Sequence, residues 1–244
     1  MPKDPLFEIV DKKLGLQAPQ TFGNRELPDP DKALEAAEAA MYNFLSSLGI
    51  DMEDTNTIGT PIRVAKMYQQ ELLSGYTMPE PNLTSFAIDD QGSDQVTVTG
   101  IPVHSLCAHH LMPIAGFAAV SAFFIPDEEE KTNLLGLSKF ARVVEMYSRR
   151  LQTQEIIGRQ VANYILDNTK AVWVGVHIKA DHFCMSHRGV RIHGSKTITT
   201  KFRRKEVPSD AVTAYYKEDN KFFYISESRS EELKRSFLDE VHSV

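Results

Sequence analysis

Residues 95–126 read QVTVTGIPVHSLCAHHLMPIAGFAAVSAFFIP, and this stretch decides the fold. From Gln95 the hydrophobic period is two, because Val96 and Val98 alternate with threonines. Residues 117–125 then form a long apolar run that ends at Pro126. Both patterns are typical of β-strands, so the stretch predicts two strands in the middle of the chain.

Outside this stretch, apolar residues recur at steps of three and four, which predicts helices. The predicted helices cover residues 30–48, 60–73, 136–151 and 153–167. Alternating residues predict further strands at 172–178 and 197–202. Because strands and helices do not alternate regularly along the chain, the order favours an α+β protein with a mainly antiparallel sheet.

Caps and turns divide the rest of the chain. Residues 1–30 contain five prolines and no sustained period, so we expect an extended N-terminal arm. Thr60-Pro61 predicts a helix start, with Thr60 as the capping residue. Residues 215–225, with Asp219-Asn220 in the middle, predict a hairpin. Ser228 and Glu231 have the spacing of a capping box before a final helix.

Composition narrows the class of protein. The chain has 244 residues, 42% hydrophobic and 25% charged, with a formal net charge of −6. The acidic balance argues against a general nucleic-acid coat, and no apolar run approaches the length of a membrane span. The N-terminal residues lack the pattern of a signal peptide. We therefore expect a soluble cytoplasmic protein with no nucleic-acid or membrane partner, in which both cysteines are free thiols or metal ligands.

The densest chemical signal is Cys107-Ala108-His109-His110, followed far downstream by His182-Phe183-Cys184. A turn can bring Cys107 and His110 onto one ion, and Cys184 could supply a second sulfur. Three protein ligands leave the fourth position of zinc for water, which is the pattern of a catalytic site. His109 and His182 lie beside these ligands, where proton donors and acceptors are needed. The alternative is that the cysteines are small buried residues without a metal.

Two further patterns suggest a nucleotide. Two pairs of basic residues spaced three apart follow predicted helix starts, where backbone N–H groups also favour phosphates. These pairs are Arg63 with Lys66 and Lys139 with Arg142, and Arg188 could join them. Gln154 and Glu155 place an amide beside a carboxylate, which can read the donor edge of a purine. The alternatives are solvated basic residues and an ordinary polar helix start.

Together these segments resemble the GTP cyclohydrolase I family. The resemblance covers about residues 31–202, with the order and spacing of its motifs preserved. The motifs are TPIRVAKMY (60–68), CAHH (107–110) with Pro113 and Gly116, GLSKFAR (136–142), RRLQTQE (149–155), and HFCM (182–185) with Arg188-Gly189.

The resemblance implies a fold, a reaction and a set of residues. It implies a T-fold with an antiparallel sheet packed by helices, assembled into a toroidal homodecamer whose active sites lie between subunits. Water would add to C8 of GTP, formate would leave, and closure would yield 7,8-dihydroneopterin triphosphate. Zn²⁺ would be held by Cys107, His110 and Cys184. His109 and His182 would handle protons, Glu155 with Gln154 would bind guanine, and the triphosphate would meet Arg63, Lys66, Ser138, Lys139, Arg142 and Arg188.

The chain departs from the family pattern in three places. Ala108 stands where the family usually has Glu, which removes a carboxylate near the metal. Thr153 stands where Val is frequent. Residues 203–226 form a longer insert before the final helix. We thus expect an N-terminal helical region at 31–94 and a T-fold catalytic domain at 95–244.

Three alternatives remain from the sequence. The first is a T-fold assembly that binds a purine nucleotide without hydrolysing it, which only Ala108 favours. The second is a deazapurine nitrile reductase, which would give the two cysteines and His110 no common role. A zinc deaminase is the weakest, because its His-x-Glu and Pro-Cys-x-x-Cys signature is missing.

Overall fold

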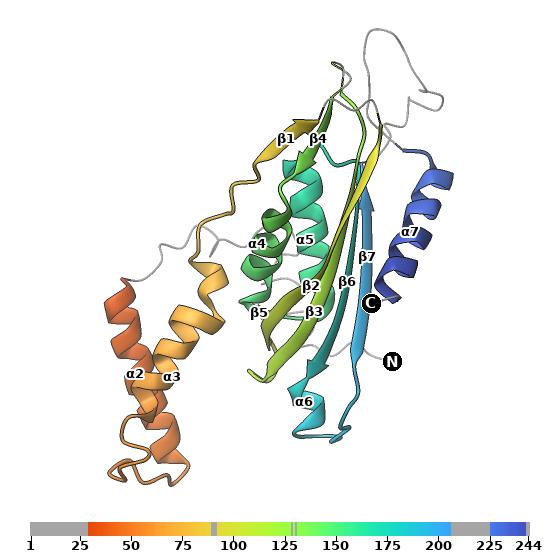
Figure 1. Ribbon diagram of the computed structural model, residues 1–244. Coiled ribbons are helices and arrows are strands. Elements are labelled where there is room, and N and C mark those ends of the chain that lie inside the picture. The colour runs from red at the N-terminus through yellow and green to blue at the C-terminus, as the bar shows by residue number, and fades with distance from the viewer. Residues whose placement is uncertain (1–28, 89–91, 128, 130, 206–224, 243–244) are drawn as a thin grey trace, which may run out of the picture.

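The computed structural model describes residues 29–88, 92–127, 129, 131–205 and 225–242, and Figure 1 shows their arrangement. A twisted sheet forms the centre, and helices lie on both of its faces. A pair of helices near the N-terminal end projects to one side of this body. No helix in these described ranges is both long enough and apolar enough to cross a membrane.

The central sheet has five strands in the order β5-β2-β3-β6-β7. They are β2 (Asp94–Cys107), β3 (Pro113–Phe124), β5 (Leu151–Gln152), β6 (Trp173–His182) and β7 (Thr197–Arg204). Neighbours pair in antiparallel fashion except the short β5, which runs parallel to β2. The prediction of an α+β protein with a mainly antiparallel sheet is therefore confirmed.

Helices cover the two faces of this sheet and bury a hydrophobic layer on each. They are α4 (Leu137–Ser148) and α5 (Gln154–Asn168) on one face, and α7 (Glu227–His242) on the other. Phe140 and Ile157 are buried in the first layer. Trp173 and Phe237 are buried in the second. Because β6 is covered on both faces, residues 173–178 are all buried, and His177 is the one polar side chain among these six.

The projecting arm contains α2 (Pro30–Ser47), α3 (Thr60–Lys66) and the short turns η1 (Met67–Leu72) and η2 (Ser74–Tyr76). The carboxylate of Asp29 caps α2 by accepting hydrogen bonds from two backbone N–H groups, as the Asp29-Pro30 pair predicts. Gly49, with φ of +79°, follows the end of α2. Helix α2 has no buried residue; Phe44 on the helix and Leu48 directly after it are exposed.

Several boundaries differ from the sequence predictions. Gly59, not Thr60, precedes α3, and Thr60 is already helical. The hydroxyl of Ser226, not that of Ser228, accepts from the N–H of Arg229 at the start of α7. Leu151 belongs to β5 because the helix ends at residue 148. The two N-caps lie one or two residues from the predicted positions, and the helix end lies three residues before the predicted one.

One pair of strands was not predicted. β1 (Ser85–Ile88) pairs in antiparallel fashion with β4 (Thr132–Leu135), in segments for which the sequence pattern predicts no strand. Most of the predicted arm at 1–30 and of the insert at 203–226, including the hairpin turn at 219–220, lies outside the described residues.

Candidate metal centre and active site

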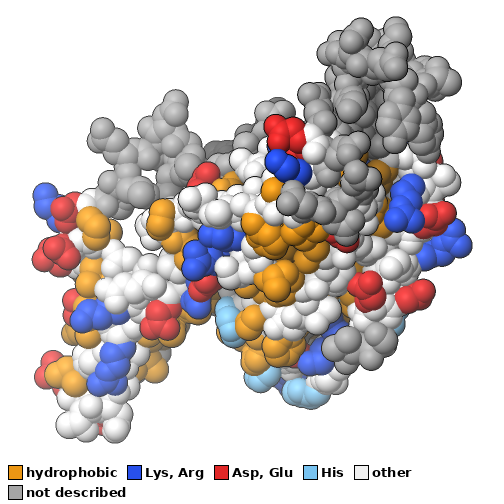
Figure 2. Space-filling model, turned by 45° about the horizontal axis from the view of Figure 1, so that its top comes forward, with side chains coloured by type: hydrophobic (Ala, Val, Ile, Leu, Met, Phe, Trp, Pro, Cys, Tyr) orange, Lys and Arg blue, Asp and Glu red, His pale blue; other side chains and the backbone are white. Residues whose placement is uncertain are grey.

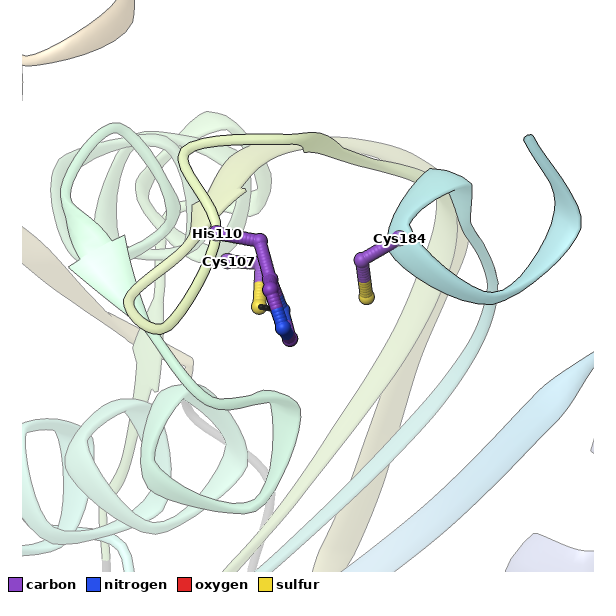
Figure 3. A group of neighbouring side chains, drawn as sticks. All are labelled: Cys107, His110 and Cys184. Atoms are coloured by element: carbon purple, nitrogen blue, oxygen red, sulfur yellow. Dashed lines mark hydrogen bonds between the residues drawn. The ribbon is translucent and has the colours of Figure 1, made fainter. Parts of the chain in front are cut away.

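The structure brings Cys107, His110 and Cys184 together at one end of the sheet (Figure 3). Cys107 is the last residue of β2, and Cys184 lies on α6 (Phe183–Ser186), directly after β6. Strand β3 pairs with both β2 and β6, so the ends of those two strands are neighbours although their cysteines are far apart in sequence. One ligand atom from each residue lies within 4.8 Å of the other two.

The turn after β2 directs the His110 side chain toward Cys107. The N–H of Cys107 donates to the carbonyl of Met112, and the N–H of Leu111 donates back to the carbonyl of Cys107. Leu111 adopts a left-handed conformation with φ of +56°, which is uncommon for a residue with a branched side chain. This tight turn places Nδ1 of His110 at 3.6 Å from Sγ of Cys107.

These residues fit a zinc ion. Zinc binds cysteine sulfur at about 2.3 Å and histidine nitrogen at about 2.0–2.1 Å, so a tetrahedral S···N edge measures about 3.6 Å. The observed separation between Cys107 and His110 is 3.6 Å. Sulfur and imidazole nitrogen are also the ligand types that zinc prefers. Among the residues that the structure describes, the group supplies three ligands, which is the number typical of a catalytic zinc site.

The surroundings of Cys184 favour the neutral thiol when no cation is present. Burial raises the pKa of the Cys184 thiol, and the hydrogen bond and charge of Cys107 raise it further. The nearby guanidinium of Arg188 acts in the opposite direction. A bound cation would oppose this upward shift by stabilising the Cys184 thiolate.

The two predicted proton-handling histidines lie beside this group. Nδ1 of His109 is 3.8 Å from Sγ of Cys107. Nε2 of His182 is 2.8 Å from the side-chain oxygen of Gln154, the first residue of α5. Burial lowers the pKa of His182, against the charges of Glu155 and Asp181, which raise it. Histidine side chains gather at this lower edge of the molecule in Figure 2.

Gln154 and Glu155 are neighbours in sequence but lie in different environments. Gln154 is completely buried, and its side-chain nitrogen donates to backbone and hydroxyl oxygens of β6 and β7. Glu155 is exposed at the N-terminal turn of α5. The carboxylate is therefore accessible to a ligand, whereas the amide is occupied within the protein.

The predicted phosphate-binding residues are not all near the metal ligands of the same chain. The C-terminal end of α4 leads into β5, which pairs with Cys107, so the first turn of α4 lies a helix length away, about 18 Å. Ser138, Lys139 and Arg142 occupy that distant half of the helix. Arg63 and Lys66 belong to α3 in the projecting arm, which packs mainly against α2.

Arg188 alone of the basic set is close enough to Cys184 to influence its ionisation. In the described part of the chain, no hydrogen bond or ion pair engages the side chains of Arg63, Lys66, Lys139, Arg142 and Arg188. Their charges are thus available to a ligand.

Sequence analysis missed the residues that surround Gln154. Thr199 of β7 and the carbonyl oxygens of Ile178 and Thr197 accept its hydrogen bonds. No local sequence pattern marks the backbone carbonyl groups of β6 and β7 as partners of a side chain on α5. Alternation along residues 197–202 predicted the strand but not this function.

Fold and site together define an α+β protein in which two cysteines and one histidine, a group that could hold a metal ion, lie at the end of a mainly antiparallel sheet. The chain belongs to the GTP cyclohydrolase I family, whose model matches residues 37–215. This is the family whose motifs the sequence resembles, and membership agrees with the expected T-fold.

Curated relatives support the assignment. GTP cyclohydrolase 1 of Brucella anthropi is 44% identical over 168 residues, which are 68% of this chain and 76% of that protein. The protein of the same name from Bartonella henselae is 35% identical over 206 residues, which are 84% of this chain and 94% of the relative. GTP cyclohydrolase 1 of Streptococcus suis is 42% identical over 167 residues, covering 68% and 86% of the two chains.

Solved structures give weaker likenesses. A dihydroneopterin aldolase from Burkholderia thailendensis bound to guanine has a TM-score of 0.35 at 14% identity, covering 47% of this chain and 93% of that one. The archaeosine synthase QueF-Like in its apo form has a TM-score of 0.32 at 16% identity, covering 48% and 96%. At these scores the two structures add nothing to the family assignment.

Proposed function

We propose that this protein is a zinc-dependent GTP cyclohydrolase I, which converts GTP into 7,8-dihydroneopterin triphosphate and releases formate. The observation that carries this proposal is the grouping of Cys107, His110 and Cys184 in a chain of this family. When bound, zinc supplies a Lewis acid that lowers the pKa of water toward neutrality and so provides hydroxide for attack on the base.

The chain's own residues account for binding of the guanine and movement of protons. The exposed carboxylate of Glu155 accepts hydrogen bonds from the ring N–H and amino group of guanine. His182 protonates a nitrogen of the imidazole ring as water adds to C8, and His109 handles a second proton. A second hydration releases formate, and the ribose carbons rearrange before the new ring closes.

The triphosphate requires a second copy of the chain. The first turn of α4 lies a helix length from the metal ligands of its own chain, and the basic residues of α3 lie in the projecting arm, which supports sites completed by neighbouring subunits. The exposed apolar side chains of α2 also favour burial in an assembly. We propose a homodecamer, with Arg63, Lys66, Ser138, Lys139, Arg142 and Arg188 meeting the triphosphate.

The product could enter folate, biopterin or deazapurine synthesis. Two unbridged thiols that serve as metal ligands fit the reducing conditions of the cytoplasm, where we place the protein. The alternative of a non-catalytic nucleotide-binding assembly gains no support. Nucleotide binding alone needs neither an accessible metal nor the histidines His109 and His182 beside its ligands.

Turnover with GTP tests the proposal. The purified protein, reconstituted with zinc, should release one formate per GTP and yield a pterin that fluoresces after oxidation. Cys184→Ala should lose metal and both products together. Nucleotide binding by the zinc-loaded protein without formate release would instead support the non-catalytic alternative.

A further inference from the structure

The side chain of Gln154 is held by the sheet. Its nitrogen donates to the carbonyl oxygen of Ile178 at 3.0 Å and to that of Thr197 at 3.1 Å. The hydroxyl oxygen of Thr199 lies at 3.1 Å from the same nitrogen. Gln154 has no solvent exposure, so water cannot replace these partners. The amide nitrogen is therefore fully occupied inside the protein.

Chemistry fixes which end of this amide faces the sheet. Backbone carbonyl groups only accept hydrogen bonds, so a flipped amide would bring its oxygen against two other oxygens. The nitrogen of Gln154 must face Ile178 and Thr197, and its oxygen must face His182. That oxygen lies 2.8 Å from Nε2 of His182, which is a normal hydrogen-bond distance.

The orientation of the Gln154 amide determines which ring nitrogen of His182 carries the hydrogen. An amide oxygen carries no hydrogen, so Nε2 of His182 must be the donor in this contact. In the neutral ring the second nitrogen, Nδ1, then carries the lone pair and can accept a proton, and in the imidazolium form Nδ1 carries the proton that His182 gives to the substrate. The nitrogen bonded to Gln154 is not available to a substrate, so Nδ1 is the atom that can exchange a proton with one.

We propose that Gln154 is a positioning residue, which holds His182 as its Nε2–H tautomer and presents Nδ1 to the substrate. This inference rests on the proposed function and changes the role expected for Gln154 from the sequence. Guanine recognition then falls to Glu155, which is exposed beside it. Gln154 acts on the reaction only through His182.

Kinetics separate positioning from base recognition. Gln154→Met keeps the length of the side chain and removes both hydrogen-bonding ends. We expect kcat to fall about 10- to 100-fold, the scale of a misplaced catalytic group. The KM for GTP and the preference for GTP over inosine triphosphate, which lacks the 2-amino group, should stay unchanged. A raised KM with a lost preference would show that Gln154 reads the base and would overturn the proposal.

A double-mutant cycle separates positioning from general support of the fold. In a His182→Ala background, Gln154→Met should have no further effect on kcat, because the ring it positions is absent. An equal loss in both backgrounds would overturn the proposal. Gln152→Met is the matched control, since Gln152 is also buried and its side chain bonds to Tyr147 and Gln160, away from His182. It should leave kcat unchanged, with equal zinc content in all variants.

A spectroscopic measurement does not depend on turnover. In protein labelled with 15N-histidine, the signals of His182 are those lost in His182→Ala. They should show a protonated Nε2 in the wild type and a mixture of tautomers in Gln154→Met. A protonated Nδ1 with a bare Nε2 in the wild type would refute the proposal. Failure of the wild type to release formate would refute the proposed function. The NMR measurement would still decide whether Gln154 fixes the tautomer of His182.

Discussion

Replacing each of the adjacent histidines His109 and His110 by alanine should have unequal effects on zinc binding. Nδ1 of His110 lies 3.6 Å from Sγ of Cys107, which matches the S···N edge of a zinc tetrahedron, about 3.6 Å. His109 lies 3.8 Å from the same sulfur and is not part of the three-residue group. Loss of an outer partner of a metal ligand costs about 10- to 100-fold in affinity. Loss of a direct ligand should cost more.

We therefore expect His110→Ala to weaken zinc binding more than about 100-fold, or about 2.7 kcal/mol. His109→Ala should keep one zinc per chain through dialysis and lose turnover. Competition with a chromophoric chelator measures the affinities, and X-ray absorption of the wild type should show two sulfur ligands near about 2.3 Å. Equal zinc affinities in the two variants would refute the assignment of the ligand set.

Three further changes probe the rest of the molecule. Phe237→Ala should destabilise the chain by about 3–5 kcal/mol in thermal melts, because Phe237 is fully buried edge-to-face against Trp173 and the sheet beneath cannot collapse into the cavity. Burial and the neighbouring His242 lower the pKa of His177 in the folded protein. The unfolded chain therefore takes up a proton at this histidine at a higher pH than the folded chain, so the free energy of unfolding should fall as the pH drops below about 6.5. His177→Gln should weaken this dependence of stability on pH. Glu155→Gln should raise the KM for GTP about 10- to 100-fold, the value of hydrogen bonds to a charged group, and should remove the preference for GTP over inosine triphosphate in steady-state kinetics.

Each of these changes has a control. Phe86→Ala removes an exposed ring of β1 and should leave the melting temperature almost unchanged. His104→Gln changes an exposed histidine and should leave the pH profile of stability as steep as in the wild type. Loss of stability below 1 kcal/mol in Phe237→Ala, a steep profile in His177→Gln, or an unchanged KM in Glu155→Gln would each contradict its prediction.

Local periodicity determined most of the elements. The alternation from Gln95 and the apolar run to residue 125 correspond to β2 and β3, and the three- and four-residue steps correspond to α2, α4 and α5. The strand, α4 and α5 predictions succeeded because each of these elements buries a continuous face, whereas α2 shows the helical period although none of its residues is buried in the single chain. The pair β1–β4 was missed because its strands are short, and Ser85, Phe86 and Ala87 on β1 are exposed. Caps were misplaced because several polar residues compete near each helix end.

The sequence by itself also determined the candidate ligands, because cysteine and histidine at this spacing are the groups that zinc prefers. Only the tertiary structure decided that Cys184 joins Cys107, since β3 must pair with β2 on one edge and with β6 on the other before the two strand ends meet. The environment of Gln154 is likewise a tertiary result. Its identity allows either base recognition or internal hydrogen bonding, and burial beneath β6 and β7 selects the second by supplying carbonyl groups that only its nitrogen can satisfy.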